Sequence, residues 1–110
     1  MKQDMHDTLL IAWTTVDSNA VARRLANDLV TTKLAACVQI EAGVESVYCW
    51  EGTVQSTREC RLMVKFAAAR SAELLAYIEA QHPYEVPEWV VVRADQVAPG
   101  YLKWTLGESE

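Results

Sequence analysis

Two runs of alternating apolar and polar residues meet in the stretch "CVQIEAGVESVYCWEGTVQSTRECRLMVKF" (Cys37–Phe66). In the first run, one face carries Val38, Ile40, Ala42, Val44, Tyr48 and Trp50. In the second run, one face carries Cys60, Leu62, Val64 and Phe66. A period of two residues is typical of a β-strand, and Gly52 between the runs can take the positive φ of a tight turn. The stretch therefore predicts one long β-hairpin, with strands over Cys37–Trp50 and Val54–Phe66. Ser46 interrupts the first run, which we interpret as a β-bulge.

The segments on either side of the hairpin have different periods. Residues 8–15, "TLLIAWTT", are nearly all apolar or β-branched, which favours a strand buried on both faces. The following residues repeat at intervals of three and four, and Asp17 or Ser18 is a natural N-cap, so we predict an amphipathic helix. Its apolar stripe consists of Ala22, Leu25, Ala26, Leu29, Val30 and Leu34.

Beyond the hairpin, residues 68–82 predict a second amphipathic helix, with Leu74, Leu75 and Ile78 as its apolar stripe. Pro83 ends this helix, because a proline disfavours helical backbone at the residue before it. Residues 88–95, "EWVVVRAD", predict a fourth strand, and residues 99–108 a short helix or irregular cap.

The order of these elements predicts an α+β fold, the ferredoxin-like βαββαβ sandwich with a long central hairpin. Right-handed crossovers place both helices on one face of an antiparallel sheet. We expect a single domain over residues 1–110, with residues 1–7 flexible.

The predicted hairpin is longer than its neighbours can cover. Its first strand is about 46 Å long at ~3.3 Å per residue, whereas a helix of about sixteen residues spans about 24 Å. The projecting part carries Val44, Val47, Tyr48, Trp50 and Val54. Such an apolar edge favours an oligomer. The alternatives are that the C-terminal segment folds over it or that a bulge bends it back.

Composition excludes several classes of protein. The net charge of −5 and the scattered basic residues argue against nucleic-acid binding. No apolar run is long enough to span a membrane, and the polar N-terminus is unlike a signal peptide, so we predict a cytoplasmic protein. Cys37, Cys49 and Cys60 lack metal-site spacing and are interpreted as core residues.

His82 is the main candidate for chemistry, and three interpretations of it stay open. It can interact with the last carbonyls of its helix, ligate a metal ion, or act as a general base near Tyr84, Glu85 and Glu88. Cys37 is a second, weaker candidate ligand. The sequence has no nucleophile elbow, phosphate loop or H-E-x-x-H motif, so we predict no catalytic residue and no enzyme.

Four motifs in register resemble the CutA family of divalent-cation tolerance proteins: "KLAACV" (33–38), "VYCWEG" (47–52), "HPYEVPE" (82–88) and "YLKW" (101–104). The resemblance implies a homotrimer with long hairpin strands between subunits, where Val44, Tyr48 and Trp50 would pack. It also implies weak binding of copper or another divalent cation. Bacterial members with a proposed copper site have a cysteine and a histidine pair where this chain has Trp13 and Gln81-His82, so only His82 carries over.

The expected architecture is also similar to that of the PII signalling proteins, an analogy at the level of the fold alone. It implies an alternative function, a regulatory trimer that binds a small-molecule effector in clefts between subunits. The candidate cleft residues are Tyr84, Glu88 and Trp89.

Overall fold

The computed structural model describes residues 8–107, so the predicted flexibility of residues 1–7 lies outside the described residues. The strands are β1 (Leu9–Val16), β2 (Cys37–Trp50), β3 (Thr53–Ala67) and β4 (Val90–Arg93). The helices are α1 (Asn19–Thr31), α2 (Ser71–Gln81) and α3 (Pro99–Thr105), and a short 3-10 turn (Ala68–Arg70) precedes α2.

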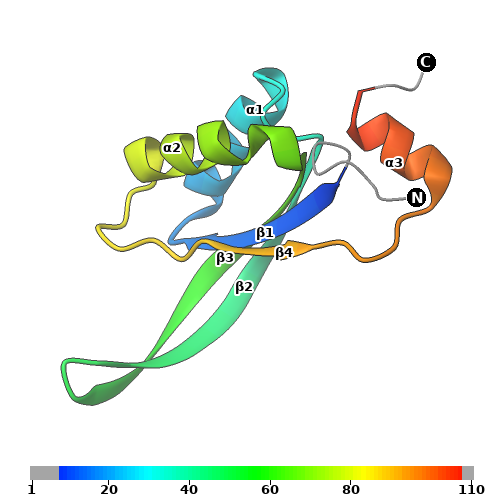
Figure 1. Ribbon diagram of the computed structural model, residues 1–110. Helices are drawn as coiled ribbons and strands as arrows, with labels where there is room; N and C mark the ends of the chain where they lie inside the picture. Colours follow the sequence, from blue (N-terminus) through cyan, green and yellow to red (C-terminus); the bar gives the residue numbers. More distant parts are fainter. Residues whose placement is uncertain (1–7, 108–110) are drawn as a thin grey trace.

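The strands form one antiparallel sheet in the order β2-β3-β1-β4, with α1 and α2 together on one face (Figure 1). This confirms the predicted α+β fold with a long central hairpin. The last strand is shorter than the predicted residues 88–95, because β4 pairs only with Leu10–Trp13 of β1.

The core lies between the sheet and the two helices. The predicted inner face of β3 is confirmed, since Leu62 and Val64 are fully buried and Phe66 is 1% exposed. From the helices, Leu25, Leu29, Leu74 and Ile78 are fully buried against it. The predicted apolar stripes of the two helices were too wide, because Val30 and Leu75 are exposed. Each of these residues directly follows a buried leucine, and one step along a helix turns a side chain about 100° away from the core.

The β-bulge lies at Ala42–Gly43, where the pairing with β3 shifts register between Glu41 and Val44. The prediction of a bulge at Ser46 was therefore wrong. Gly43 has a φ of +71°, which a residue without a Cβ adopts at little cost. Since side chains alternate between faces, the extra residue exchanges the two faces of everything that follows it.

The exchange separates residues that the sequence placed on one face. Ile40 pairs with buried Leu62 on the helix side of the sheet. Beyond the bulge, Val44 pairs with Glu59, which lies one residue out of phase with the core positions of β3. Tyr48 and Trp50 follow Val44 in steps of two, so these three side chains belong to the open face of the sheet, which α1 and α2 do not cover. The prediction that they share a face with Ile40 was wrong.

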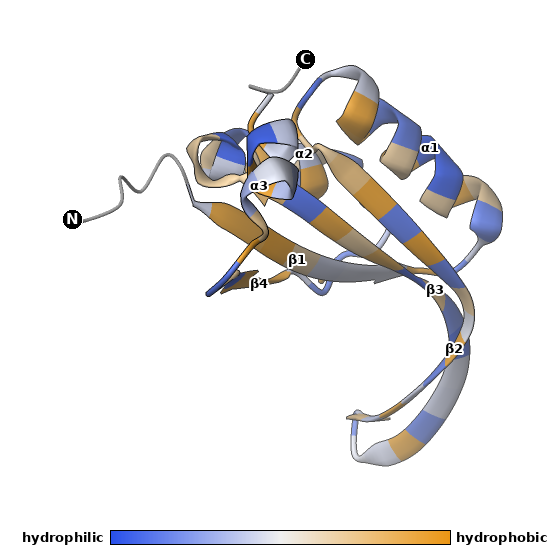
Figure 2. Cartoon of the chain, turned by 90° about the vertical axis from the view of Figure 1, so that its right-hand side faces the viewer, coloured by the Kyte–Doolittle hydropathy of each residue, from blue (hydrophilic) through white to orange (hydrophobic). Residues whose placement is uncertain are grey.

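The hairpin projects far beyond the helices, as predicted. The chain measures 50 × 28 × 23 Å, and its radius of gyration of 15.2 Å exceeds the value of about 13 Å that is typical of a compact domain of this length. The hairpin curls away from the two-layer body (Figure 2), with Val47 65%, Trp50 55% and Val54 73% exposed. Helix α3 lies at the opposite end of the molecule from its tip, so it does not cover the hairpin (Figure 1).

The bulge generates a stability prediction. We expect Gly43→Ala to lower the free energy of unfolding by about 1–2 kcal/mol, because the added Cβ is strained at positive φ. The new methyl group would meet only Arg58 Nη1, at an ordinary distance of 3.8 Å, so steric overlap is not the cause. Gly100→Ala is the matched control, since a Cβ there meets nothing within 4 Å and the residue lies in α3. It should raise stability by about 0.5 kcal/mol. Urea unfolding at one protein concentration measures both, and equal effects would contradict the assigned bulge.

Candidate functional site: a cleft beside His82

His82 connects the end of α2 to the end of β1. It is the C-cap of α2, with an extended ψ of 136° that agrees with the effect expected of Pro83. The residue is 8% exposed, and its Nε2 lies 2.9 Å from the Thr15 carbonyl oxygen and 3.0 Å from Thr14 Oγ1. The ring thus contacts β1, and not the last carbonyls of α2.

The partners of His82 define its tautomer. The backbone N–H of Tyr84 donates to Nδ1 over 3.1 Å, so Nδ1 carries no proton. Nε2 therefore carries the proton and donates to the Thr15 carbonyl. Burial lowers the pKa of His82 and outweighs the hydrogen bond to Thr15 and the charges of Asp17 and Glu59, which act in the opposite direction. Both nitrogens of a neutral ring are thus engaged by the protein.

Tyr84 extends this network to the hairpin. Its hydroxyl donates to Glu59 Oε2 on β3 over 2.7 Å, and its ring meets that of His82 edge-on at 4.9 Å. Burial, followed by the bond to Glu59, raises the pKa of the Tyr84 hydroxyl, which therefore stays a donor at neutral pH. The loop after α2 is held in this way against both β1 and β3.

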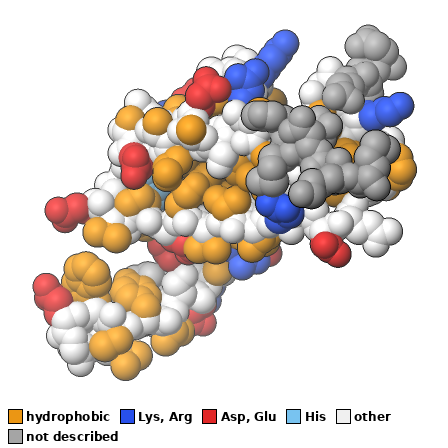
Figure 3. All heavy atoms as spheres, in the orientation of Figure 1, with side chains coloured by type: hydrophobic (Ala, Val, Ile, Leu, Met, Phe, Trp, Pro, Cys, Tyr) orange, Lys and Arg blue, Asp and Glu red, His pale blue; other side chains and the backbone are white. Residues whose placement is uncertain are grey.

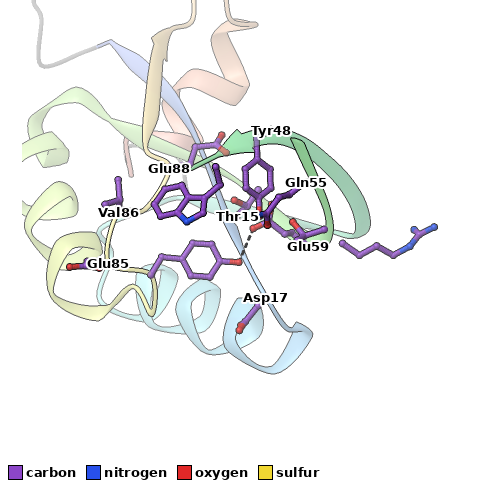
Figure 4. Close-up of a pocket in the computed structure, with 12 residues that line it drawn as sticks. Thr15, Asp17, Tyr48, Gln55, Glu59, Glu85, Val86 and Glu88 are labelled. Carbon is purple, nitrogen blue, oxygen red and sulfur yellow. Dashed lines mark hydrogen bonds between the residues drawn. The ribbon is translucent and has the colours of Figure 1, made fainter. Parts of the chain in front are cut away.

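A cleft of about 740 Å³ opens between this loop and the hairpin. Its walls include the rings of Tyr48, Trp50 and Tyr84, and its acidic residues are Asp17, Glu59, Glu85 and Glu88. In Figure 4, the Tyr84 hydroxyl reaches Glu59, Tyr48 and Gln55 lie on the hairpin, and the Glu85 side chain points away from them. The volume is typical of small-molecule sites.

The bulge at Gly43 makes this cleft possible. It turns Tyr48 and Trp50 toward the open face, on which Thr15 and Glu59 also lie. A regular strand would direct both rings to the other side of the hairpin. Sequence reasoning missed Thr15, Asp17 and Glu59 as cleft residues. The positive φ that Gly43 tolerates was the one available signal.

The structure places the predicted site residues in different surroundings. Tyr84 and Glu88 line the cleft, but Trp89 stacks on Phe66 at 6.4 Å and is not among the lining residues. Cys37 pairs with Lys65, near the opposite end of β1 from the residues that His82 contacts. Within residues 8–107, no three His, Cys, Asp or Glu side chains lie close enough together to hold one metal ion. Metal ligation by His82 or Cys37 stays a prediction.

Comparison with known proteins agrees with this architecture. The sequence matches the family described as CutA1 divalent ion tolerance protein over residues 10–108. The chain belongs to the CutA1 family. It is 38% identical over 98 residues to the divalent-cation tolerance protein CutA of Pectobacterium atrosepticum, covering 89% of this chain and 88% of that protein. The crystal structure of CutA1 from Oryza sativa has a TM-score of 0.89 at 33% identity, with 97% of this chain and 98% of that one covered.

Membership of the CutA1 family confirms the predicted resemblance. The CutA1 family is not an enzyme family, which confirms the prediction that this protein is not an enzyme. No helix in residues 8–107 combines the length and the apolar character needed to cross a membrane. The chain is also 39% identical over 95 residues to a CutA protein of Arabidopsis thaliana named chloroplastic, and spans 52% of that protein's length. A cytoplasmic location therefore stays a prediction for this CutA1-family chain.

His82 generates a prediction about pH. The pKa of His82 is lowered below its ordinary value of 6.5, so the unfolded chain binds this proton more readily than the folded chain does. The contribution of neutral His82 to the free energy of unfolding is therefore fully present above about pH 6.5. It is lost as the pH drops toward the lower pKa of the folded state. We expect the urea midpoint to fall between about pH 7 and pH 5, with a shallower fall in His82→Gln.

The other histidine offers the control. His6→Gln measures the part of the slope that comes from His6, and this part is subtracted before the effect of His82→Gln is assessed. If His82→Gln proves too unstable to measure, proton NMR titration of the His82 ring in the unaltered protein gives its pKa directly. A value at or above 6.5 would contradict the assigned burial.

Proposed function

We propose that this CutA1-family protein acts in divalent-cation tolerance as a cytoplasmic homotrimer, with at most weak binding of copper or another divalent cation. The observation that carries the proposed assembly is the set of exposed apolar side chains on the open face of the sheet and on the projecting hairpin. The trimer itself follows from the family resemblance.

The apolar character of the open face follows from strand register. Trp13 pairs with Met63 on one side and Val90 on the other, and Ile11 pairs with Val92. These residues are out of phase with the core positions of their strands, so they face away from α1 and α2. In the isolated chain Val90 is 51% and Val92 42% exposed. Arg61 and Glu41, which form an ion pair, border this surface on the hairpin side.

The hairpin extends the same surface. Val44, Tyr48 and Trp50 lie on the open face beyond the bulge, and Figure 3 shows further hydrophobic side chains gathered on the projecting part. A protein that exposes many large apolar side chains on one side is prone to association. Packing of the three hairpins against neighbouring copies, at Val44, Tyr48 and Trp50, would remove this area from water.

We expect metal binding by this chain to be weak. His82 is the predicted ligand and Cys37 the less favoured one, but they lie at different ends of the sheet, and both nitrogens of His82 are hydrogen bonded. A metal ion would have to displace the Tyr84 N–H or the Thr15 carbonyl. One imidazole supplies too few ligands for tight binding of copper.

A regulatory trimer that binds a small effector is the alternative function, and the cleft beside Tyr84 favours it. The effector sites of the PII proteins lie between subunits, and this cleft likewise borders the surface on which a neighbouring copy would pack. Its Tyr48 and Trp50 rings belong to both surfaces.

The proposed assembly predicts a mass of three times the chain mass of 12.3 kDa in light scattering at micromolar concentration. We expect Val92→Asp to lower that mass, because a carboxylate buried in an apolar interface is unfavourable. Leu75→Asp is the matched control, since Leu75 is 40% and Val92 42% exposed in the isolated chain, but Leu75 lies on the helix layer. A stable monomer of the unaltered protein, or equal effects of both variants, would contradict the proposed interface.

Calorimetric titration with copper(II) tests the metal. We expect a dissociation constant no tighter than about 1 mM, since a single imidazole is a poor site. His82→Ala should weaken this binding further, and His6→Ala separates any contribution of the other histidine. Identical binding by His82→Ala and the unaltered protein would remove His82 from any site. A tight site that is lost in His82→Ala would instead establish His82 as a ligand.

A further inference from the structure

A second cavity lies at the end of the molecule that carries α3, opposite the tip of the hairpin (Figure 1). Its volume of about 440 Å³ is within the range of small-molecule sites. The end of α1, the turn before α2 and helix α3 supply its walls, whose apolar residues include Val30, Leu34, Ala67, Trp104 and Leu106. Val30 and Trp104 are 43% and 49% exposed, which leaves apolar area for a ligand to cover. The cavity shares no residue with the cleft beside Tyr84.

The ionisable side chains of this lining are basic. Lys33 and Arg70 line the cavity, and among residues 8–107 no carboxylate does. The whole chain has 15 acidic and 10 basic residues, so an exclusively basic lining is opposite in sign to its net charge of −5. Arg70 donates to Glu73 over 3.1 Å, but Glu73 does not line the cavity. A guanidinium has five N–H donors, so Arg70 keeps donors for an anion.

Lys33 has a backbone conformation that is unfavourable for a lysine. Its φ of +64° lies in the left-handed region, directly after Thr32, the C-cap of α1, where glycine is the usual residue. A lysine near the end of a helix commonly donates to the last carbonyls. The Lys33 ammonium instead has no hydrogen bond or ion pair with any described residue. Its positive charge is therefore available to a ligand of the cavity.

We propose that this cavity binds an organic carboxylate with an apolar body. The planar guanidinium of Arg70 donates to the carboxylate, the Lys33 ammonium adds a second positive charge, and the body lies against Trp104 and Val30. A singly charged anion is favoured over a phosphate, because the carbonyls at the end of α1 carry partial negative charge beside Lys33. The proposal goes beyond the proposed function and depends neither on metal binding nor on the cleft beside Tyr84.

Calorimetric titration with hydrocinnamate tests the proposal, using the full chain in its solution assembly. Phenethyl alcohol and phenethylammonium, which share the phenyl group but are neutral and cationic, are the matched ligands. We expect hydrocinnamate to bind with a dissociation constant of about 1 mM or tighter, at least about tenfold tighter than either analogue. Phenyl phosphate should bind more weakly than hydrocinnamate. Added salt should weaken hydrocinnamate binding, because both cations are exposed to solvent.

Substitution of Lys33 separates binding from stability. Lys33→Gly should weaken hydrocinnamate binding about three- to tenfold, yet raise the urea midpoint, because glycine adopts left-handed backbone at little cost. A purely structural role of Lys33 would change the midpoint alone. Lys33→Gln and Lys103→Gln form the matched pair: each removes one positive charge from an exposed position, but Lys103 does not line the cavity. Lys103→Gln should leave the affinity unchanged.

Two further variants test the other contacts. Arg70→Lys keeps the charge but removes the planar guanidinium, and we expect binding to weaken about three- to tenfold. Its control is Glu73→Gln, which removes the carboxylate that Arg70 contacts at the surface and should not weaken binding. Trp104→Leu should weaken binding about threefold, because it removes part of the apolar wall.

Several results would overturn the proposal. They are absence of hydrocinnamate binding, equal or tighter affinity for phenethyl alcohol or phenyl phosphate, and equal losses in Lys33→Gln and Lys103→Gln. Binding that appears only in Val92→Asp would make a neighbouring copy the occupant of the cavity. Binding that appears only when Glu108 and Glu110, which follow Gly107 in the sequence, are both changed to Gln would make the chain's own acidic end the occupant. Light scattering on the same samples keeps this test separate from that of the trimer, because each can fail alone.

Discussion

The cleft and the apolar surface both depend on one extra residue in β2. Side chains on a strand alternate between faces, so the bulge at Ala42–Gly43 exchanges the faces of everything beyond it. Before the bulge, Val38 pairs with buried Val64 on the helix side and packs against the core. After it, Tyr48 and Trp50 share the open face with Thr15. One strand therefore completes the core at one end and forms a wall of the cleft at the other.

The opposite wall is fixed by a histidine that the protein keeps neutral. Pro83 stops α2 at His82, and the imidazole then connects the helix end to the Thr15 carbonyl. Because Nδ1 accepts the Tyr84 N–H, the same ring also orients the tyrosine that reaches Glu59. Both walls are thus positioned against the end of β1. This arrangement loses stability at low pH, because protonation of the buried imidazole would break the hydrogen bond from the Tyr84 N–H.

The sequence predicted the local structure well and the site only in part. Both ends of β2 were predicted correctly, because alternation starts at Cys37 and stops at the turn after Trp50. The bulge was misplaced because a glycine leaves no mark on an apolar–polar pattern, whereas Ser46 visibly breaks it. The contacts of His82 were not predictable, since its partner Thr14 lies 68 residues away and local patterns carry no information on such contacts.

A role in divalent-cation tolerance does not require the protein to hold the metal. The rings of Tyr48 and Trp50 belong both to the cleft and to the apolar face on which another copy would pack. A ligand that contacts these rings therefore alters the surface available for packing, and packing alters the affinity for the ligand by the same factor. In the proposed assembly, such reciprocal coupling would let a ligand of the cleft change the assembly without any metal-ligand bond. It would also explain why the carboxylates of the cleft are spread around aromatic walls and do not converge on one point.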